Sequence, residues 1–469
     1  MVDRALYAAI DAFIEENWEQ VVADIGALVR IPSVEELGKA GPGAPFGPGP
    51  AAALKEALAI SERLGFQATD CEGHIGFADL PGKRETQFGI IGHMDVVPAG
   101  NGWDFEPFAV TRHEGYLVGR GCVDDKGPTV VALYAAKFLS EHYGAELPYT
   151  VRVIFGANEE SGMRDVTYYR ERFADPAFVV TPDADFPVCY GEKGGFDGRV
   201  TSKPLAEDAM ILEFTGGMAM NAVPSLAQVL IRACADDLPP ADRITIEDSG
   251  GNALLTATGI GGHASLPEGT VNAIGLLVEY LLEHGLYTQD ERPFLELQHD
   301  LLSAHDGSGV GLQTSDEAFG PLTLIGGTVG MTEDRRIAQT IDIRFPTSIT
   351  DEEIFEKLAA RAKAIGGGFE NTLLMPPFLI DKDSPVIQAL LDGYNEVTGD
   401  AGEPFTIGGG TYAREFTAGA SFGPGMPWLE NPAWVGAEHC ANEAVLEEML
   451  KKAMKIYIVT FDKILHLEL

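Results

Sequence analysis

Two adjacent glutamates, Glu159 and Glu160, follow a strongly apolar run in the stretch IFGANEESGM, residues 154–163. Paired carboxylates at the end of a buried strand can bind a metal ion or exchange protons with a substrate. They can equally belong to a solvated loop, because charged and polar residues are common where strands lead into surface connections. The two glutamates alone therefore do not decide between a functional site and a surface turn.

Four further segments end apolar runs with residues that can bind metals. They contain His93 and Asp95 (IIGHMDVVP), Asp124 and Asp125 (GRGCVDDKG), Asp183 and Asp185 (VVTPDADFPV), and His439 (VGAEHCANE). Each has a structural alternative, namely a hydrogen-bonded histidine, a helix N-cap or a turn. Together they form a mixed nitrogen and oxygen ligand set that suits Zn²⁺, or less specifically Co²⁺ or Mn²⁺. Because such a set exceeds the needs of one tetrahedral ion, it predicts two metal ions that share a bridging carboxylate.

The elements that carry these residues have the pattern of an α/β domain. Helical periodicity over Asp3–Val29, Ala51–Leu64 and Pro128–His142 alternates with the apolar runs FGIIGH, YTVRVIFGAN and AFVVTP. This alternation predicts a largely parallel sheet flanked by helices, in which functional groups collect outside the carboxyl ends of the strands. Strand periodicity would also place His93 and Asp95 on one side, so that the carboxylate could orient the imidazole.

The middle of the chain has a different pattern. Strand-like segments mix there with two helical stretches near residues 270–285 and 351–365, which indicates an inserted α+β domain. Amphipathic helical segments, SPVIQALLDGYNEVTG and NEAVLEEMLKKAMKIYIVTFDKIL, follow and could cover the first sheet. We therefore predict a discontinuous catalytic domain of residues 1–190 and 381–469, interrupted by a lid domain of residues 191–380. The Gly- and Pro-rich stretch GKAGPGAPFGPGPAAA is predicted to be a loop.

Composition excludes several classes of partner. The 469 residues include 71 acidic and 33 basic ones, and the formal charge of -38 would repel nucleic acid and an anionic membrane surface. The N-terminal segment carries acidic residues throughout, unlike a signal peptide or a membrane span. Five scattered cysteines without CxxC spacing indicate a reducing cytoplasm.

Six motifs occur in an order and spacing that resemble the M20 family of zinc metallopeptidases. They are GHMDVVP, GRGCVDDKG, NEESG, PDADFPVCYGEKG, GIGGHASLPEGTVNAI and GAEHCANE. Within the family they are most similar to a bacterial dipeptidase that cleaves dipeptides with a free N-terminus. The resemblance covers nearly the whole chain and implies two zinc ions and a small peptide substrate.

The resemblance also implies roles for individual residues. It gives His93 and Asp183 to one zinc, Glu160 and His439 to the other, and Asp124 as the bridge. It implies a cis peptide bond between Asp124 and Asp125, and it makes Asp95 the residue that orients His93. Since neighbours in an extended segment point opposite ways, Glu160 would bind metal while Glu159 faces the attacking water. Glu159 would then accept the proton of that water and deliver it to the leaving amine.

Residues of the inserted domain are implied to hold the substrate. His263 would contact the tetrahedral intermediate, although it could instead be a surface histidine. The substrate carboxylate would be bound by Asn221, Arg344, Gly409, Gly410 and Thr411. Arg344 could otherwise be a surface charge at the end of a strand. The insertion is long enough to imply a monomer whose lid supplies what a partner subunit contributes in dimeric relatives.

Several alternatives remain open at this level. An N-acyl-amino-acid deacylase, an aminotripeptidase or a succinyl-diaminopimelate-type amidase would keep the same metal core, and a non-catalytic binding relative is disfavoured because all the ligands and Glu159 are present. Cys122 and Cys440 lie beside ligand motifs, but we expect them to be small buried residues and not thiolate ligands. The sequence therefore predicts a cytoplasmic metallo-dipeptidase.

Overall fold

A computed structural model describes residues 4–469, so Asp3, the predicted start of the first helix, lies outside the described residues. The chain forms two structural units. The first unit runs through Tyr190 and resumes over residues 379–405 and 410–469, and the inserted unit comprises residues 191–378 and 406–409. The predicted boundaries differ from this division at residues 379–380 and 406–409. Gly409 therefore belongs to the inserted unit and Gly410 to the first.

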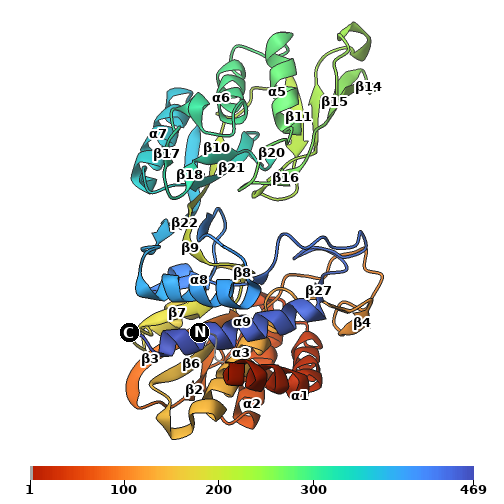
Figure 1. Ribbon diagram of the computed structural model, residues 1–469. Coiled ribbons are helices and arrows are strands. Elements are labelled where there is room, and N and C mark those ends of the chain that lie inside the picture. The colour runs from red at the N-terminus through yellow and green to blue at the C-terminus, as the bar shows by residue number, and fades with distance from the viewer. Residues whose placement is uncertain (1–3) are drawn as a thin grey trace. The chain divides into compact units, whose positions relative to one another are not determined.

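The first unit is built on a nine-stranded sheet (Figure 1). In spatial order its strands are β1 (Gln67–Cys71), β2 (Ile75–Leu80), β6 (Tyr149–Gly156), β3 (Arg84–His93), β7 (Phe178–Thr181), β25 (Gly419–Ser421), β9 (Cys189–Glu192) and β23 (Phe378–Leu379), with β24 (Phe405–Ile407) beside β9. The strands β6, β3, β7 and β25 pair in parallel, whereas β1, β2 and the β25–β9 pair are antiparallel. The predicted fold class is confirmed, and the parallel part of the sheet is its centre.

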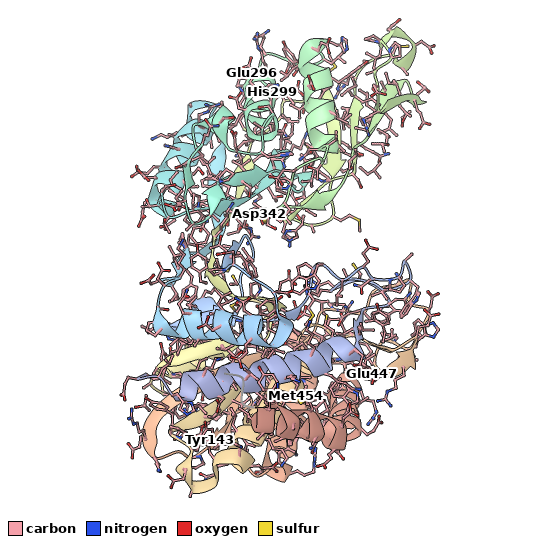
Figure 2. All side chains as sticks on the ribbon, in the orientation of Figure 1. Tyr143, Glu296, His299, Asp342, Glu447 and Met454 are labelled. Atoms are coloured by element: carbon pink, nitrogen blue, oxygen red, sulfur yellow. The ribbon has the colours of Figure 1, made fainter. Side chains whose placement is uncertain are left out.

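Helices cover both faces of this sheet. They are α1 (Arg4–Val29), α2 (Pro48–Arg63), α3 (Lys126–Tyr143), α4 (Arg164–Arg170), α8 (Pro385–Thr398) and α9 (Glu447–Leu465). Strand residues alternate between two cores, as the period of two requires. Ile90 and Val153 pack with α1, α2, α3, α8 and α9, whereas Ile91 and Ile154 pack on the opposite face with α4. Figure 1 shows α8 beside α9, and Met454 of α9, labelled in Figure 2, is fully buried.

Two stretches of the first unit have a structure other than the predicted one. The helix α2 begins at Pro48, inside the stretch predicted to be a loop, because proline is compatible with the first turn of a helix. The start of the predicted C-terminal helix is instead the strand β27 (Ala444–Leu446), which pairs with β5 (Tyr116–Val118). The strand β4 (Thr111–His113) completes that small sheet, and β8 (Ala184–Asp185) pairs with β26 (Pro424–Gly425). Over residues 4–469, no helix has the length and apolar character needed to cross a membrane.

The inserted unit is the predicted α+β domain. Its main sheet has the order β14 (Ile244–Ser249), β15 (Asn252–Thr258), β13 (Leu226–Ile231), β11 (Ile211–Gly216), β20 (Val329–Met331), β21 (Ile337–Phe345), β10 (Gly194–Thr201) and β22 (Gly368–Met375), with β19 (Thr323–Ile325) beside β21. Short pairs are formed by β12 (Ala222–Val223) with β16 (Gly262–His263) and by β17 (Ser315–Asp316) with β18 (Gly320–Pro321). The helices are α5 (Ala273–Glu283), α6 (Arg292–Leu302) and α7 (Asp351–Ala364). The helix α6 was not predicted, although Phe294, Leu297 and Leu301 have helical spacing and are buried.

Candidate metal centre

The carboxyl edge of the central parallel strands carries three of the predicted ligands. His93 is the last residue of β3, Glu160 follows the end of β6, and Asp183 follows the end of β7. Because β6, β3 and β7 are adjacent and parallel, their carboxyl ends meet at one edge of the sheet. Asp124 precedes α3, and His439 lies in the loop before β27.

The Asp124 carboxylate lies between the two histidines. Its Oδ1 is 2.8 Å from Nε2 of His93, and its Oδ2 is 2.8 Å from Nε2 of His439. The peptide bond between Asp124 and Asp125 is cis, as predicted. One carboxylate oxygen therefore faces each imidazole, which is the arrangement that a bridging ligand requires.

The remaining ligand candidates surround this carboxylate. Oε2 of Glu160 lies 3.2 Å from Nε2 of His439, and Oδ2 of Asp183 lies 3.9 Å from Nε2 of His93. Ligand atoms of His93, Asp124 and Glu160 all lie within 4.8 Å of one another, which makes these three residues a candidate metal site. Nitrogen and carboxylate ligands at this spacing suit Zn²⁺ and related divalent ions.

Carboxyl groups outnumber the histidines at this site. Burial raises the pKa of Asp183 to about 8, with Asp124 adding to the shift, and burial raises the pKa of Glu159 well above its usual range. Hydrogen bonds to Asp124 and Glu160 raise the pKa of His439 to about 11. For Asp124 itself, burial raises the pKa, but the two histidines outweigh it and lower the pKa. Carboxylates whose burial and mutual repulsion raise their pKa are a donor set that divalent cations would stabilise.

Asp95 contacts both His93 and the turn that carries the two glutamates. Nδ1 of His93 lies 3.0 Å from the backbone oxygen of Asp95, whereas the nearer carboxylate oxygen is 3.6 Å away. The Asp95 carboxylate also accepts hydrogen bonds from the backbone N–H groups of Glu159 and Glu160, both at 3.1 Å. The main-chain oxygen and the carboxylate of Asp95 therefore both lie beside Nδ1 of His93, and the role of this carboxylate in orienting the imidazole stays a prediction.

Glu159 and Glu160 lie in a turn, not in the extended segment that the sequence analysis assumed. Asp165, at the start of α4, accepts from the backbone N–H groups of Ala157 at 2.7 Å and Asn158 at 3.1 Å. The Tyr412 hydroxyl donates to the same Asp165 oxygen. Burial raises the pKa of Asp165 to about 6. The turn is therefore held by Asp95 on one side and Asp165 on the other, and no motif identified Asp165 or Tyr412.

A buried ion pair connects the loops that carry Asp124 and His439. Arg120 donates to Oε2 of Glu443, and both side chains are fully buried. Oε1 of Glu443 accepts from the backbone N–H of Gly121 at 2.8 Å and of Val123 at 3.3 Å. Glu443 ends the GAEHCANE motif, and its position there was the available signal for a role that the sequence analysis missed. It fixes the residues just before Asp124 to the segment just after His439.

The two cysteines beside the ligands differ from each other. Cys122 is buried, as expected, and burial raises the pKa of its thiol well above the usual range. Cys440 is exposed, which corrects the expectation that it is buried. It lies in a surface loop and not in a core. All five cysteines of the chain are free.

In the inserted unit, the β12–β16 pair brings two predicted residues together. Ala222 pairs with His263, and the backbone N–H of Ala264 donates to the backbone oxygen of Asn221 at 2.9 Å. The backbone N–H of Ser265 donates to Nδ1 of His263 at 3.2 Å. A neutral ring that accepts at Nδ1 carries its proton on Nε2, so His263 can present a donor.

Arg344 lies on β21 and is largely buried. Its Nε and Nη2 donate to the carboxylate of Asp342, labelled in Figure 2, at 2.8 Å and 2.6 Å. A substrate carboxylate could therefore use only the Nη1–Nη2 side of the guanidinium. Burial raises the pKa of Asp197, on the neighbouring strand β10, to about 7, with Asp342 adding to the shift.

The Gly409–Thr411 segment spans the boundary of the two units. The Thr411 side chain is buried, lies 2.8 Å from the Ser421 hydroxyl and accepts from the backbone N–H of Ala413 at 3.1 Å. This hydroxyl caps a short 3₁₀ helix, Tyr412–Glu415, that presents Tyr412 to Asp165. Thr411 thus has a structural role whether or not it contacts substrate.

Comparison with known proteins places the chain in a family. The fold resembles that of human carnosine dipeptidase 1, with a TM-score of 0.58, 15% identity, and coverage of 98% of this chain and 100% of that one. It also resembles the dipeptidase Dug1p of Saccharomyces cerevisiae, with a TM-score of 0.59, 14% identity, and coverage of 99% of both chains. The model of peptidase family M20/M25/M40 matches residues 89–463.

Bacterial relatives match over nearly their whole length. A Staphylococcus epidermidis protein named "Putative dipeptidase" is 31% identical over 460 residues, which are 94% of this chain and 96% of that protein. "Putative dipeptidase YtjP" of Bacillus subtilis is 31% identical over 454 residues, which are 94% of this chain and 97% of that protein. The chain belongs to peptidase family M20/M25/M40, which confirms the resemblance found in its motifs.

Proposed function

We propose that the protein is a dizinc metallopeptidase that hydrolyses dipeptides with a free N-terminus and a free C-terminal carboxylate. The observation that carries this proposal is the Asp124 carboxylate, which lies 2.8 Å from the imidazoles of both His93 and His439. Its support is the membership of the peptidase family and the relatives named as dipeptidases.

The donor set fits a pair of divalent ions. His93 and Asp183 would hold one ion, Glu160 and His439 the other, and Asp124 both. Such ions lower the pKa of a water molecule towards neutrality and polarise a carbonyl oxygen. Since zinc prefers nitrogen and carboxylate ligands at low coordination number, zinc is the proposed metal, with Co²⁺ or Mn²⁺ as possible substitutes.

Glu159 is the proposed proton carrier. Its backbone is fixed by the Asp95 carboxylate at 3.1 Å, and burial raises the pKa of its side chain well above the usual range. A carboxylate with a raised pKa is a stronger base, so it can take a proton from an attacking water and release it to the leaving amine. Asp95 and Asp165 position the turn that carries it.

Residues of the inserted unit would complete the reaction. We assign the oxyanion of the tetrahedral intermediate to Nε2 of His263. We assign the substrate carboxylate to Asn221, Arg344 and Thr411 with the backbone of Gly409 and Gly410. This assignment would limit the substrate to two residues, because one end requires a carboxylate and the other the reacting carbonyl. A monomer and a cytoplasmic location remain predictions of the sequence.

A metal count combined with a substrate panel tests the proposal. We expect close to two zinc equivalents in the purified protein, loss of activity on chelation and recovery with Zn²⁺, Co²⁺ or Mn²⁺. The panel contains Leu-Gly, Leu-Gly-Gly, Leu-Gly amide and N-acetyl-leucine. Cleavage of Leu-Gly alone is expected. Preference for N-acetyl-leucine would indicate a deacylase, preference for the tripeptide an aminotripeptidase, and full activity after exhaustive chelation would exclude the metal mechanism.

A further inference from the structure

Two acidic residues of the inserted unit face each other across neighbouring strands. Asp197 of β10 is directly opposite Asp342 of β21, and the two strands lie side by side in Figure 1. Residues in this position project from the same face of an antiparallel sheet, with Cβ atoms about 4.5–5.5 Å apart. The Asp342 side chain is fully buried, and Oδ1 of Asp197 is buried as well. Two ionised carboxylates in this position would repel each other.

One oxygen of this acidic pair lacks a donor. Oδ1 of Asp197 receives no hydrogen bond from the described residues 4–469, whereas both Asp342 oxygens accept from Arg344. Burial raises the pKa of Asp197 to about 7, and the Asp342 carboxylate adds to the shift. Ionised carboxylates only accept hydrogen bonds, so two of them can be joined only by a proton. A single proton held between the two groups would satisfy this oxygen and remove the repulsion.

The free side of Arg344 lies close to this pair. Its Nε and Nη2 are bonded to Asp342, and its Nη1 lies over Gly195 of β10, where a Cβ atom would come within 3.3 Å of it. Gly195 is two residues from Asp197, so both positions belong to one face of the strand. The part of the guanidinium that remains for a substrate carboxylate is therefore beside the acidic pair.

Charged residues near Asp197 along the chain have partners of their own. Arg199 lies 2.7 Å from Glu370 of β22, and Lys193, just before β10, donates to a backbone oxygen of β18 at 2.5 Å. Leu373 of β22 is opposite Asp197 and carries no charge. The acidic pair and the arginine bonded to it therefore form one electrostatic group.

One further titratable side chain comes from the β12–β16 pair. His263 of β16 precedes Ala264, which belongs to the same buried cluster as Ile325 of β19. Ile325 is in turn opposite Asp342. The titration of this histidine must therefore be separated from that of the acidic pair in any experiment.

The net charge of Asp197, Asp342 and Arg344 depends on the proton between the two acids. With it, Arg344 balances Asp342 and the group is neutral; without it, the group carries one net negative charge. A net negative charge beside the guanidinium would repel a substrate carboxylate.

We propose that Asp197 and Asp342 share one proton and that this proton sets the affinity of Arg344 for the C-terminal carboxylate of the substrate. The inference rests on the proposed function, in which Arg344 binds that carboxylate. It deepens that function by adding a specificity-determining residue, Asp197, that no motif identified.

A binding experiment with a ligand that cannot be hydrolysed tests the proposal. The ligand is the ketomethylene isostere of Leu-Gly, in which CH₂ replaces the peptide nitrogen, and its matched control is the same compound with a carboxamide in place of the carboxylate. Calorimetry on the zinc-loaded protein gives the ratio of the two Kd values at about pH 6 and about pH 8.5, below and above the pKa of Asp197. We expect the preference for the acid to fall at least about tenfold at the higher pH, because loss of the shared proton brings like charges together. A constant preference would overturn the proposal.

The variant Asp197→Asn tests whether the effect belongs to Asp197. Asparagine keeps the shape and stays neutral, so its preference for the acid should change by less than about twofold between the two pH values. Asp197→Ser, neutral and smaller, provides a second test of the same expectation. The control Asp242→Asn changes an exposed aspartate of the same unit and should retain the wild-type fall. A fall of wild-type size in folded, zinc-loaded Asp197→Asn would overturn the proposal and assign the titration to another group, such as His263.

The shared proton can also be measured without any ligand. The pKa of Asp197, about 7 in the folded protein, lies above the value of about 4 in an unfolded chain. The folded protein therefore keeps a proton that the unfolded chain loses, and its stability relative to Asp197→Asn should fall as the pH rises from about 4 to about 7. Denaturant unfolding of both chelated proteins measures this difference, and a difference that is independent of pH would overturn the shared proton.

The outcomes separate this inference from the proposed function. Cleavage of N-acetyl-leucine in place of Leu-Gly would overturn the dipeptidase function but not the inference, because N-acetyl-leucine also ends in a carboxylate. The KM values of wild type and Asp197→Asn for it would then carry the same test. A preference for the acid that is equal at both pH values would overturn the inference and leave the function. Equal binding of acid and amide at the lower pH would show that Arg344 does not hold the carboxylate, and both would fail.

Discussion

The buried ion pair of Glu443 and Arg120 joins the residues before Asp124 to the segment after His439. A substitution at Glu443 therefore measures how much this connection contributes to stability. In Glu443→Gln, the amide oxygen can still accept from Gly121 and Val123, but the amide nitrogen must face the guanidinium. Removal of one partner of a buried pair costs about 3–5 kcal/mol. Arg120 keeps two long hydrogen bonds, 3.4 Å to the oxygen of Pro98 and 3.5 Å to that of Ala99, and its place over the Trp103 ring, 5.4 Å from the ring centroid. We therefore expect a loss of about 3 kcal/mol in the free energy of unfolding.

Denaturant unfolding of the zinc-loaded and the chelated protein measures this loss. The control Glu448→Gln changes an exposed partner of Lys451 and should cost less than about 1 kcal/mol. The double variant Arg120→Met with Glu443→Gln removes the unpaired cation and should regain about half of the lost stability. A single variant within about 1 kcal/mol of wild type, or a double variant no more stable than the single one, would refute the reasoning.

Three further predictions concern catalysis and pH. Glu159→Gln should keep both metals but lower kcat by about 10²–10⁴-fold, whereas Glu160→Gln should lose metal. Metal analysis combined with kinetics measures both effects, and the reverse result would mean that the two glutamates have each other's role. His263→Ala should lower kcat about 10²–10³-fold with little change in KM, and a change confined to KM would contradict an oxyanion role. Because burial raises the pKa of Asp165 to about 6, its folded form retains a proton that the unfolded chain loses above about pH 4. The contribution of Asp165 to the free energy of unfolding therefore falls as the pH rises from about 4 to about 6. Asp165→Asn should reduce this fall in denaturant unfolding measured across that range, and an unchanged pH dependence would contradict the prediction.

The sequence determined the fold class and the membership of the family. Apolar runs alternating with helical periodicity identified the strands β3, β6 and β7, and the rule for parallel sheets placed His93, Glu160 and Asp183 at their carboxyl ends. Both signals are local, because the apolar periodicity and the residue that follows each strand are read within a few positions. The order of the motifs added Asp124, His439 and the cis peptide bond through resemblance.

Tertiary structure alone decided what holds these residues in place. The carboxylate of Asp95 binds the glutamate turn in addition to lying beside His93, Tyr412 reaches Asp165 from a distant segment, and Glu443 ties the Asp124 loop to the segment after His439. Sequence periodicity cannot identify such partners, because it relates only residues a few positions apart, whereas each of these hydrogen bonds joins segments that are far apart in the chain. Their pairing follows from the requirement that every buried charge find a partner, and that requirement can be evaluated only once the packed chain defines which groups are buried together.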